Sequence, residues 1–364
     1  MPIQRLTLNA IDSSMLDPTQ KELIALEVIR VLYCSSDRSV NKPPTIYKHA
    51  PFHASFMSAV SPNKSGSWLN TPQFTNVNPY KLAMILEWSF FEKIAHILSN
   101  GDRRRFVASE GTGLKITLSQ KKIIDEIIRD LEWGSIQPSR EEEDTKLARA
   151  LPDAAIELID DFIASIFVET DESVEIVVLK PANFHSWDMQ REKADILRTK
   201  AALRIKFPSK QLRLYWGFPF DPWCDLPTDA NKLSFINKLH EGGRYLAYDE
   251  ILLAGELWDR LSEDSNTLEQ ILAIIRLVAV SDFLERYRFL NDPLNVDKDR
   301  VVYARLLADW NLDREFRIVE NIDDIRRALK EKKIPMRLLN NPIFDSTGNY
   351  RSERYLMLKA IGLL

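Results

Sequence analysis

Residues 161–168 (DFIASIFV) and 174–179 (VEIVVL) decide the fold of this chain. Both runs are rich in β-branched and aromatic residues, and the polar stretch 169–173 lies between them, so we expect a β-hairpin. A long helix is expected over residues 189–206, and apolar alternation predicts one more strand over 212–218. A hairpin, a helix and a strand in this order predict a small sheet with helices packed on it.

Helical periodicity dominates the chain on both sides of this sheet, because apolar residues recur every three or four positions. The expected helices cover residues 21–32, 80–98, 117–133, 141–158, 251–261, 268–290 and 322–333. The third helix starts at a capping box formed by Thr117 and Gln120 and ends before Gly134, and the fourth bends at Pro152. The fold class is therefore α+β or mixed α/β, with a small sheet flanked by helices.

Three regions follow from this pattern. Residues 1–140 form a helical N-terminal part, which includes a loop at 35–79 that is rich in proline, serine and asparagine. A loop of this length is uncommon as a plain connector, so we expect it to be functional or mobile. Residues 141–290 form the core around the sheet, and residues 291–364 form a helical C-terminal extension.

The composition of the 364 residues is that of a cytoplasmic globular protein, with 45% hydrophobic and 28% charged residues. No apolar run approaches the roughly 18 residues of a membrane span, and residues 1–10 lack the pattern of a signal peptide. Two cysteines exclude a disulfide framework. Five scattered histidines without a CxxC motif argue against a zinc site.

Charge is distributed unevenly around the expected hairpin. Residues 141–172 hold eleven acidic residues against two basic ones, whereas residues 191–213 hold eight basic residues against two acidic ones. An acidic stretch beside a basic one suits a metal-using enzyme with a polyanionic substrate. Two solvated helix faces would give the same pattern, so charge alone leaves both interpretations open.

Three residues of the hairpin have the side chains that metal-dependent phosphodiester cleavage needs. Asp161 begins the first expected strand, and Glu175 and Lys180 lie on the second. Two carboxylates, here Asp161 and Glu175, hold Mg²⁺ through oxygen ligands, and the ion activates a water molecule. A lysine near that water, here Lys180, positions or deprotonates it and offsets phosphate charge. This order of residues resembles the skeleton of the PD-(D/E)xK nucleases.

An ordered set of short motifs extends between residues 50 and 290. They are 50–56 (APFHASF), 91–97 (FEKIAHI), 161–163 (DFI), 175–183 (EIVVLKPAN), 189–201 (MQREKADILRTKA), 215–222 (YWGFPFDP) and 250–261 (EILLAGELWDRL). Taken in this order, they resemble segments of the TdeIII/MjaII-type restriction endonuclease family. The resemblance implies a type II restriction enzyme that cleaves double-stranded DNA at a short specific site with Mg²⁺. It also implies a homodimer, since a two-fold site is matched by two-fold protein symmetry, and a companion DNA methyltransferase.

The motif departs from the family pattern at one of its three catalytic positions. If Glu175 is the second acid, Val177 occupies the position of the lysine. If the turn instead places Asp161 opposite Lys180 or the residue after it, Lys180 is the lysine and Val178 occupies the position of the acid. Either Glu175 and Lys180 act from displaced positions, or the site is degenerate and inactive. In the first register, Val177→Lys is expected to raise activity.

Further candidate residues surround the hairpin. Glu92 and Asp160 are additional candidate carboxylates, and Lys193 is a candidate for contact with the metal or a phosphate. The candidate DNA-backbone contacts are Arg191, Lys193, Arg198 and Lys200 on the basic helix, and Arg103, Arg104 and Arg105 in an expected turn. Seven-residue spacing stacks Arg191 with Arg198 and Lys193 with Lys200 along that helix. The alternative is that these side chains pair with the acidic stretch 141–172.

Aromatic and histidine side chains near the hairpin are expected to be structural. Trp187, Trp216, Trp223 and Trp258 are expected to pack in the core or at its rim, and His185 to be polar surface. Two other functions remain compatible with the whole sequence. One is a catalytically inactive DNA-binding protein of the same fold, and the other is a helical interaction protein whose hairpin is structural. Metal-dependent cleavage of plasmid DNA distinguishes the first, and DNA binding at low salt distinguishes the second.

Overall fold

The computed structural model describes residues 15–36, 51–56, 79–150, 156–180, 188–224, 230–331 and 333–364. Most of the loop expected at 35–79 lies outside the described residues, as do His185 and Trp187. Within that loop, residues Pro51–Phe56 form a buried helix, α2. Among the described residues, no helix is both long and apolar enough to cross a bilayer.

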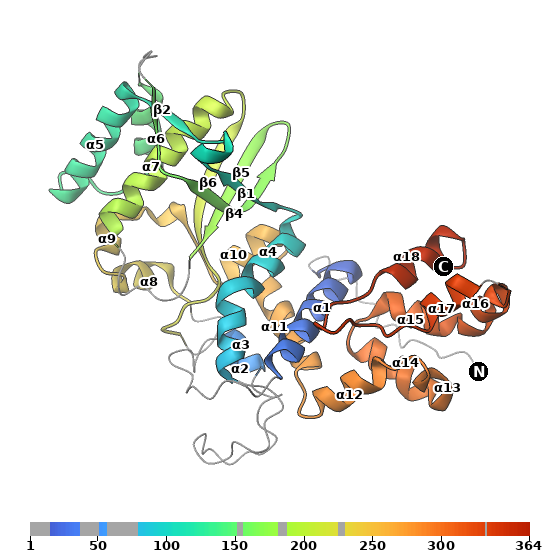
Figure 1. Cartoon of the computed structure of the whole chain (residues 1–364). Helices are drawn as coiled ribbons and strands as arrows, with labels where there is room; N and C mark the ends of the chain where they lie inside the picture. Colours follow the sequence, from blue (N-terminus) through green and yellow to red (C-terminus); the bar gives the residue numbers. More distant parts are fainter. Residues whose placement is uncertain are drawn as a thin grey trace.

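The centre of the molecule is a five-stranded mixed sheet flanked by helices, as the sequence predicted (Figure 1). Its strand order is β1-β4-β5-β6-β7, and the strands are β1 (Asp102–Phe106), β4 (Phe162–Glu169), β5 (Ser173–Leu179), β6 (Gln211–Phe218) and β7 (Ile251–Leu253). Strand β4 pairs antiparallel with β1 and β5, whereas β5, β6 and β7 run parallel. A second, two-stranded sheet joins β2 (Lys115–Thr117) to β3 (Ile156–Leu158).

The hairpin of β4 and β5 is the predicted one, and its register is well defined. Ile166 pairs with Val177 and Glu169 with Val174, and the turn closes where Thr170 N–H donates to the Ser173 carbonyl at 2.9 Å. The paired residues of the two strands end at Ile166 and Val177, and beyond them the Leu179 N–H donates to Ser165 Oγ. Extended to the strand ends, this register brings the start of β4 beside the end of β5.

The two faces of the sheet pack on different helices, because successive side chains of a strand point to opposite sides. On one face, Val177 and Gly217 meet Leu257 of α10 (Gly255–Ser262). A Cβ on Gly217 would lie 2.6 Å from Val177 Cγ1 and 3.0 Å from Leu257 Cδ1, so this close approach requires glycine. On the other face, Phe167 packs against Phe207, which follows α7 (Met189–Lys206), with ring centroids 6.0 Å apart.

The helices before the sheet largely follow the sequence prediction. Helix α1 (Pro18–Ser35) extends the predicted segment at both ends. The predicted helix at 80–98 is a continuous run of α3 (Pro79–Ile85), a π-helical turn η2 (Leu86–Phe90) and α4 (Phe91–Ser99). Helix α5 (Leu118–Glu132) begins at the predicted capping box. The helix predicted over 141–158 is wrong in its second half, because α6 (Arg140–Ala148) stops and residues 156–158 pair with β2 as strand β3.

The helices after the sheet differ more from the prediction. The segment 251–261 begins as strand β7 before it becomes α10, and the helix predicted at 268–290 is broken into two. Besides α10, the helices that follow β6 in the described part of the chain are α8 (Lys232–Lys238), α9 (Gly242–Tyr245), α11 (Thr267–Val278), α12 (Phe283–Leu290), α13 (Asn295–Lys298), α14 (Arg300–Asp309), α15 (Asp313–Glu320), α16 (Ile322–Leu329), α17 (Lys333–Leu339) and α18 (Glu353–Ala360). Those from α13 onward form the helical C-terminal part (Figure 1).

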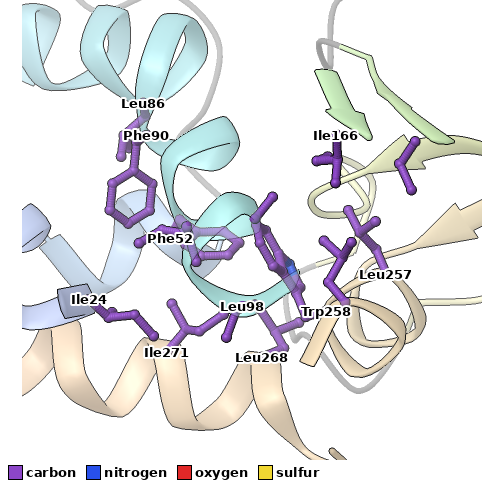
Figure 2. Packing of buried hydrophobic residues seen from close by; sticks show 14 of the residues in the cluster. Ile24, Phe52, Leu86, Phe90, Leu98, Ile166, Leu257, Trp258, Leu268 and Ile271 are labelled. Atoms are coloured by element: carbon purple, nitrogen blue, oxygen red, sulfur yellow. The ribbon is translucent and has the colours of Figure 1, made fainter. Parts of the chain in front are cut away.

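A single hydrophobic core joins the sheet to the helices (Figure 2). Phe52 of α2 packs against Phe91 of α4, with ring centroids 5.0 Å apart, and against Trp258 of α10 at 5.8 Å. The Trp258 indole N–H donates to the Pro219 carbonyl, which satisfies its one polar group. Trp216 and Trp258 are fully buried, as predicted, and Trp223 lies at the rim of the core.

Candidate active site

The structure places the three predicted catalytic residues at two different ends of the hairpin. Glu175 pairs with Val168, near the turn, whereas Asp161 lies just before the first residue of β4. Seven residue steps along β4 separate these two levels, which amounts to roughly 23 Å at about 3.3 Å per residue. Asp161 and Glu175 therefore do not converge, and one metal ion cannot join them in this arrangement.

Glu175 is held in a structural ion pair on the α10 side of the sheet. Its two carboxylate oxygens accept from Arg260 Nε at 3.0 Å and from a terminal guanidinium nitrogen of Arg260 at 2.5 Å. Arg213 lies 3.8 Å away, and the hydrogen bonds that Arg260 donates to Glu175 raise the pKa of Arg260 above its usual value. Val177, the lysine position in this register, is buried under α10. The surroundings of Glu175 are those of a fold-stabilising pair.

The opposite end of the hairpin brings together a lysine and a carboxylate. Lys180 follows β5, and its backbone N–H donates to the Gly217 carbonyl. The Lys180 ammonium lies 2.5 Å from a carboxylate oxygen of Glu192 and 5.2 Å from the ring centroid of Trp216. Glu192 belongs to the first turn of α7, where the helix dipole favours a negative charge. This arrangement agrees with the second register in placing Lys180 at the end of the hairpin where β4 begins, with Val178 in the position of the acid. The pairing of Ile166 with Val177, when extended, brings Lys180 level with Ile163 and not with Asp161.

Glu192 is a functional candidate that sequence reasoning did not identify. It was counted only as one of two acids within the basic stretch 191–213. The available signal was a carboxylate in the first turn of the helix that directly follows the hairpin. Such a position returns the side chain to the end of the strand that precedes the helix.

The start of β4 is preceded by two aspartates, Asp160 and Asp161. Asp161 Oδ1 accepts a hydrogen bond from the Ala108 N–H at 3.0 Å. Asp195, one turn after Glu192, has a raised pKa because of burial, and the charge of Asp160 raises it further, while Arg198 and Arg191 oppose the shift. Asp160, Asp161, Lys180 and Glu192 thus belong to one end of the sheet, which we call the Lys180 end.

The Lys180 end has donors that suit a hard cation only in part. In the portion of the chain that the structure describes, no three histidine, cysteine, aspartate or glutamate side chains lie close enough to hold a metal ion. Mg²⁺ is usually bound by one or two carboxylates, with water and substrate phosphates as its other ligands. The Glu192 carboxylate already holds a cation, the Lys180 ammonium. Glu192 and the carboxylates at the start of β4 thus have the oxygen ligands that Mg²⁺ prefers, but the described side chains form no preformed site for the ion.

The prediction that Lys193 contacts a metal or a phosphate, and that Lys193 and Lys200 follow a DNA backbone, is wrong. Lys193 is completely buried, and its ammonium lies 2.6 Å from both Glu143 and Glu250. Lys200 lies 3.0 Å from Glu250 and 3.4 Å from Asp144, and it is also buried. These ammonium groups cannot reach a ligand at the surface. The alternative of pairing with the acidic stretch is correct for both lysines, with Glu250 as an additional partner from outside that stretch.

The remaining basic candidates are accessible. Arg191 and Arg198 flank Asp195 on α7 at 3.8 and 3.0 Å, and the Arg191 side chain is 71% exposed. The arginines expected in a turn form instead the edge strand β1, where Arg103, Arg104 and Arg105 pair with Glu92, Glu169 and Glu110. Glu92 therefore contacts the edge of the sheet through Arg103, at the level of the middle of β4.

The sheet order, with an antiparallel hairpin followed by a helical crossover to a parallel strand, is the PD-(D/E)xK nuclease-like fold. The family model of the type II restriction endonuclease HinfI matches residues 88–279, which include all five strands of the central sheet. The type II restriction enzyme MjaII of Methanocaldococcus jannaschii is 30% identical over 360 residues, which cover 93% of this chain and 95% of that enzyme. The chain belongs to the HinfI family of type II restriction endonucleases. No solved structure matches it.

Proposed function

We propose that the chain is a Mg²⁺-dependent endonuclease that cleaves double-stranded DNA at a short specific site. The observation that carries this proposal is the contact of Lys180 with Glu192 at the end of the hairpin where β4 begins. Together with Asp161, these two residues supply the side chains that the catalytic motif requires. Family membership and the restriction enzyme MjaII support a DNA substrate.

In this proposal, Asp161 and Glu192 hold the ion, and Asp160 is the alternative to Asp161. When bound, Mg²⁺ lowers the pKa of a water ligand and stabilises charge on the phosphate. The Lys180 ammonium leaves Glu192 and points to the attacked phosphate, where it orients the water or offsets negative charge. Glu175, expected to be a metal ligand, keeps its bond to Arg260 and supports the packing of α10.

The DNA backbone is proposed to contact arginines near this site. Arg191 and Arg198 lie on α7 beside Glu192, and a phosphate can compete with Asp195 for both guanidinium groups. Arg103, Arg104 and Arg105 of the edge strand are a second candidate surface. We further propose that two copies act together as a homodimer and that a companion methyltransferase protects the same site.

Cleavage of supercoiled plasmid DNA with and without Mg²⁺ tests the proposal. The wild-type chain should produce discrete fragments with Mg²⁺ and none with a chelator. Asp161→Asn should abolish cleavage while DNA binding and the far-UV circular dichroism spectrum stay unchanged. Cleavage that persists in both Asp161→Asn and Asp160→Asn contradicts the assignment of the metal site.

One observation favours a second function, that of a catalytically inactive DNA-binding relative. Val178 stands where the second register expects a carboxylate, so the strand itself lacks one ligand. If Glu192 does not replace it, the wild-type chain should bind DNA at low salt without cutting it under any divalent metal. A chain that neither binds nor cuts DNA at low salt would instead be an interaction protein.

A further inference from the structure

A buried cluster of acidic and basic side chains includes Lys193, which directly follows Glu192 in α7. Lys193 places its ammonium between Glu143 of α6 and Glu250, which is the last residue before β7. Glu250 also accepts from Lys200 at 3.0 Å through its other carboxylate oxygen. We call Glu143, Lys193, Lys200 and Glu250 the buried clamp, and each of the four is less than 9% exposed.

The buried clamp binds α7 through two residues on one side of the helix, Lys193 and Lys200. Lys193 and Lys200 are seven residues apart, so they project from the same face of the helix two turns from each other. Both bind the single carboxylate of Glu250, and Lys193 is also bound by Glu143. Two anchors on one face fix the rotation of the helix about its axis as well as its position along that axis.

Stability alone does not account for such a cluster. Buried ion pairs cost so much desolvation that well-packed apolar side chains of similar volume are often as stable or more stable. What directional ion pairs provide over apolar contacts is one defined geometry. The geometry at stake is that of Glu192, because adjacent residues of a helix differ in direction by 100° and a small rotation of α7 would move its carboxylate off Lys180.

We propose that Lys193, Glu143 and Glu250 are positioning residues that hold Glu192 in place as a metal ligand. The inference rests on the proposed function, since it assigns Glu192 to the metal site. A metal-binding side chain must be held within about 0.5 Å of its productive position, which requires a rigid second layer of contacts. Loss of such outer contacts commonly weakens metal binding by about 10–100-fold.

The test measures binding of Mn²⁺ alone to the full-length chain, from the decrease of the electron paramagnetic resonance signal of the free ion. The test variants are Lys193→Met and the milder Glu143→Gln, which keeps the experiment usable if the first variant does not fold. The matched control is Arg354→Met, which breaks an equally buried ion pair with Glu315, 3.0 Å long, in the C-terminal helices. Circular dichroism sets a temperature at which all variants are folded.

We expect Lys193→Met and Glu143→Gln to weaken Mn²⁺ binding by about tenfold or more. Arg354→Met should lower the melting temperature as Lys193→Met does, but leave Mn²⁺ affinity unchanged. In a Glu192→Gln background, which itself binds Mn²⁺ weakly, Lys193→Met should cause no further loss.

Two results would overturn the inference, and they point to different errors. If Glu192→Gln weakens Mn²⁺ binding but Lys193→Met and Glu143→Gln bind it as Arg354→Met does, the buried clamp only stabilises the fold and the proposed metal site stands. If Glu192→Gln binds Mn²⁺ as the wild type does, the assignment of Glu192 fails and the positioning role fails with it.

Discussion

The two ends of β5 carry similar charges in very different settings. At the turn end, the Glu175 carboxylate is fully engaged by Arg260 and approached by Arg213, and the acids of the β4 start are far away. At the Lys180 end, the ammonium and the Glu192 carboxylate come from different elements and meet beside the start of β4. The order of residues in the motif favours Glu175 as the second metal-binding carboxylate, whereas the pairing of the hairpin strands favours Glu192. A catalytic position is therefore defined by where strands begin and end, and the residue type follows.

The strongest test of this comparison replaces the carboxylate at each end, in two separate variants. Glu192→Gln should reduce the cleavage rate on the order of 100-fold or more, the scale of a positioned catalytic charge, because it removes a ligand and the partner of Lys180. Glu175→Gln should change the rate only a few-fold and instead lower the melting temperature. A severe loss of cleavage in a folded Glu175→Gln variant would reverse the assignment of the two ends.

The basic residues at the two ends form a second pair. Lys180→Met should cost about 100-fold in rate with little effect on DNA binding, since positioned acid–base or charge partners contribute on this scale. Arg260→Met, which removes the partner of Glu175, should leave the rate per folded molecule close to that of the wild type. The rates are to be compared under single-turnover conditions with equal folded protein.

Introducing a lysine at the turn end should destabilise the fold and give no activity. Val177 is 1% exposed and lies against the Gly217–Leu257 contact, so Val177→Lys would bury an unpaired charge. An uncompensated buried charge costs about 3–5 kcal/mol. Urea unfolding measures that cost. A Val177→Lys variant with wild-type stability and raised cleavage would revive the first register, in which Glu175 is the second acid.

The Lys180 end should be sensitive to acid through Glu250 of the buried clamp. Burial opposes ionisation of Glu250, but the ammonium groups of Lys193 and Lys200 more than offset it and lower its pKa from 4.5 to about 2. Its contribution to stability is therefore complete above pH 4.5 and is lost as the pH falls through about 2. The difference in free energy of unfolding between wild type and Glu250→Gln should shrink over this interval, which urea titrations at several pH values would show.

The smallest expected effect concerns DNA phosphates. Arg191→Ala, at the Lys180 end, should lower the slope of log affinity against log salt by roughly one, for every DNA sequence alike. Arg213→Ala, near Glu175 at the turn end, should leave the slope unchanged. Equal slopes for the two variants would mean that the DNA backbone does not follow α7, and the arginines of β1 would be the next to test.

Strong local patterns made the centre of the fold predictable. The hairpin, α7 and β6 follow from β-branched runs, a polar turn and helical periodicity, and the structure has them with few changes at their ends. Strand β1 (DRRRF) was missed because its three consecutive arginines lack the apolar alternation of a strand, although it pairs with β4. Strands β3 and β7 have three residues each and exist through pairing with distant segments, which no local pattern contains.

The sequence predicted the region of the candidate site but not the full set of residues in it. The sequence predicted that Asp161 and Lys180 belong to one hairpin, but not which carboxylate completes them, since Glu192 approaches Lys180 through the packing of α7. The lysines of α7 misled for a related reason. Lysine is usually a surface residue, so the sequence places Lys193 and Lys200 at the surface. Their burial depends on Glu250, fifty or more residues away in sequence.

Both outer strands of the sheet are closed to a further strand, and this restricts how two copies can assemble. Strand β1 exposes charged side chains, with Arg103 and Arg105 more than half accessible, and charged edge strands resist pairing with another chain. Strand β7, at the other edge, consists entirely of buried residues. A dimer built by continuing the sheet from one subunit into the next is therefore disfavoured at both edges. The homodimer proposed above would therefore form through helical surfaces, and its contact could change without altering the strands of the central sheet.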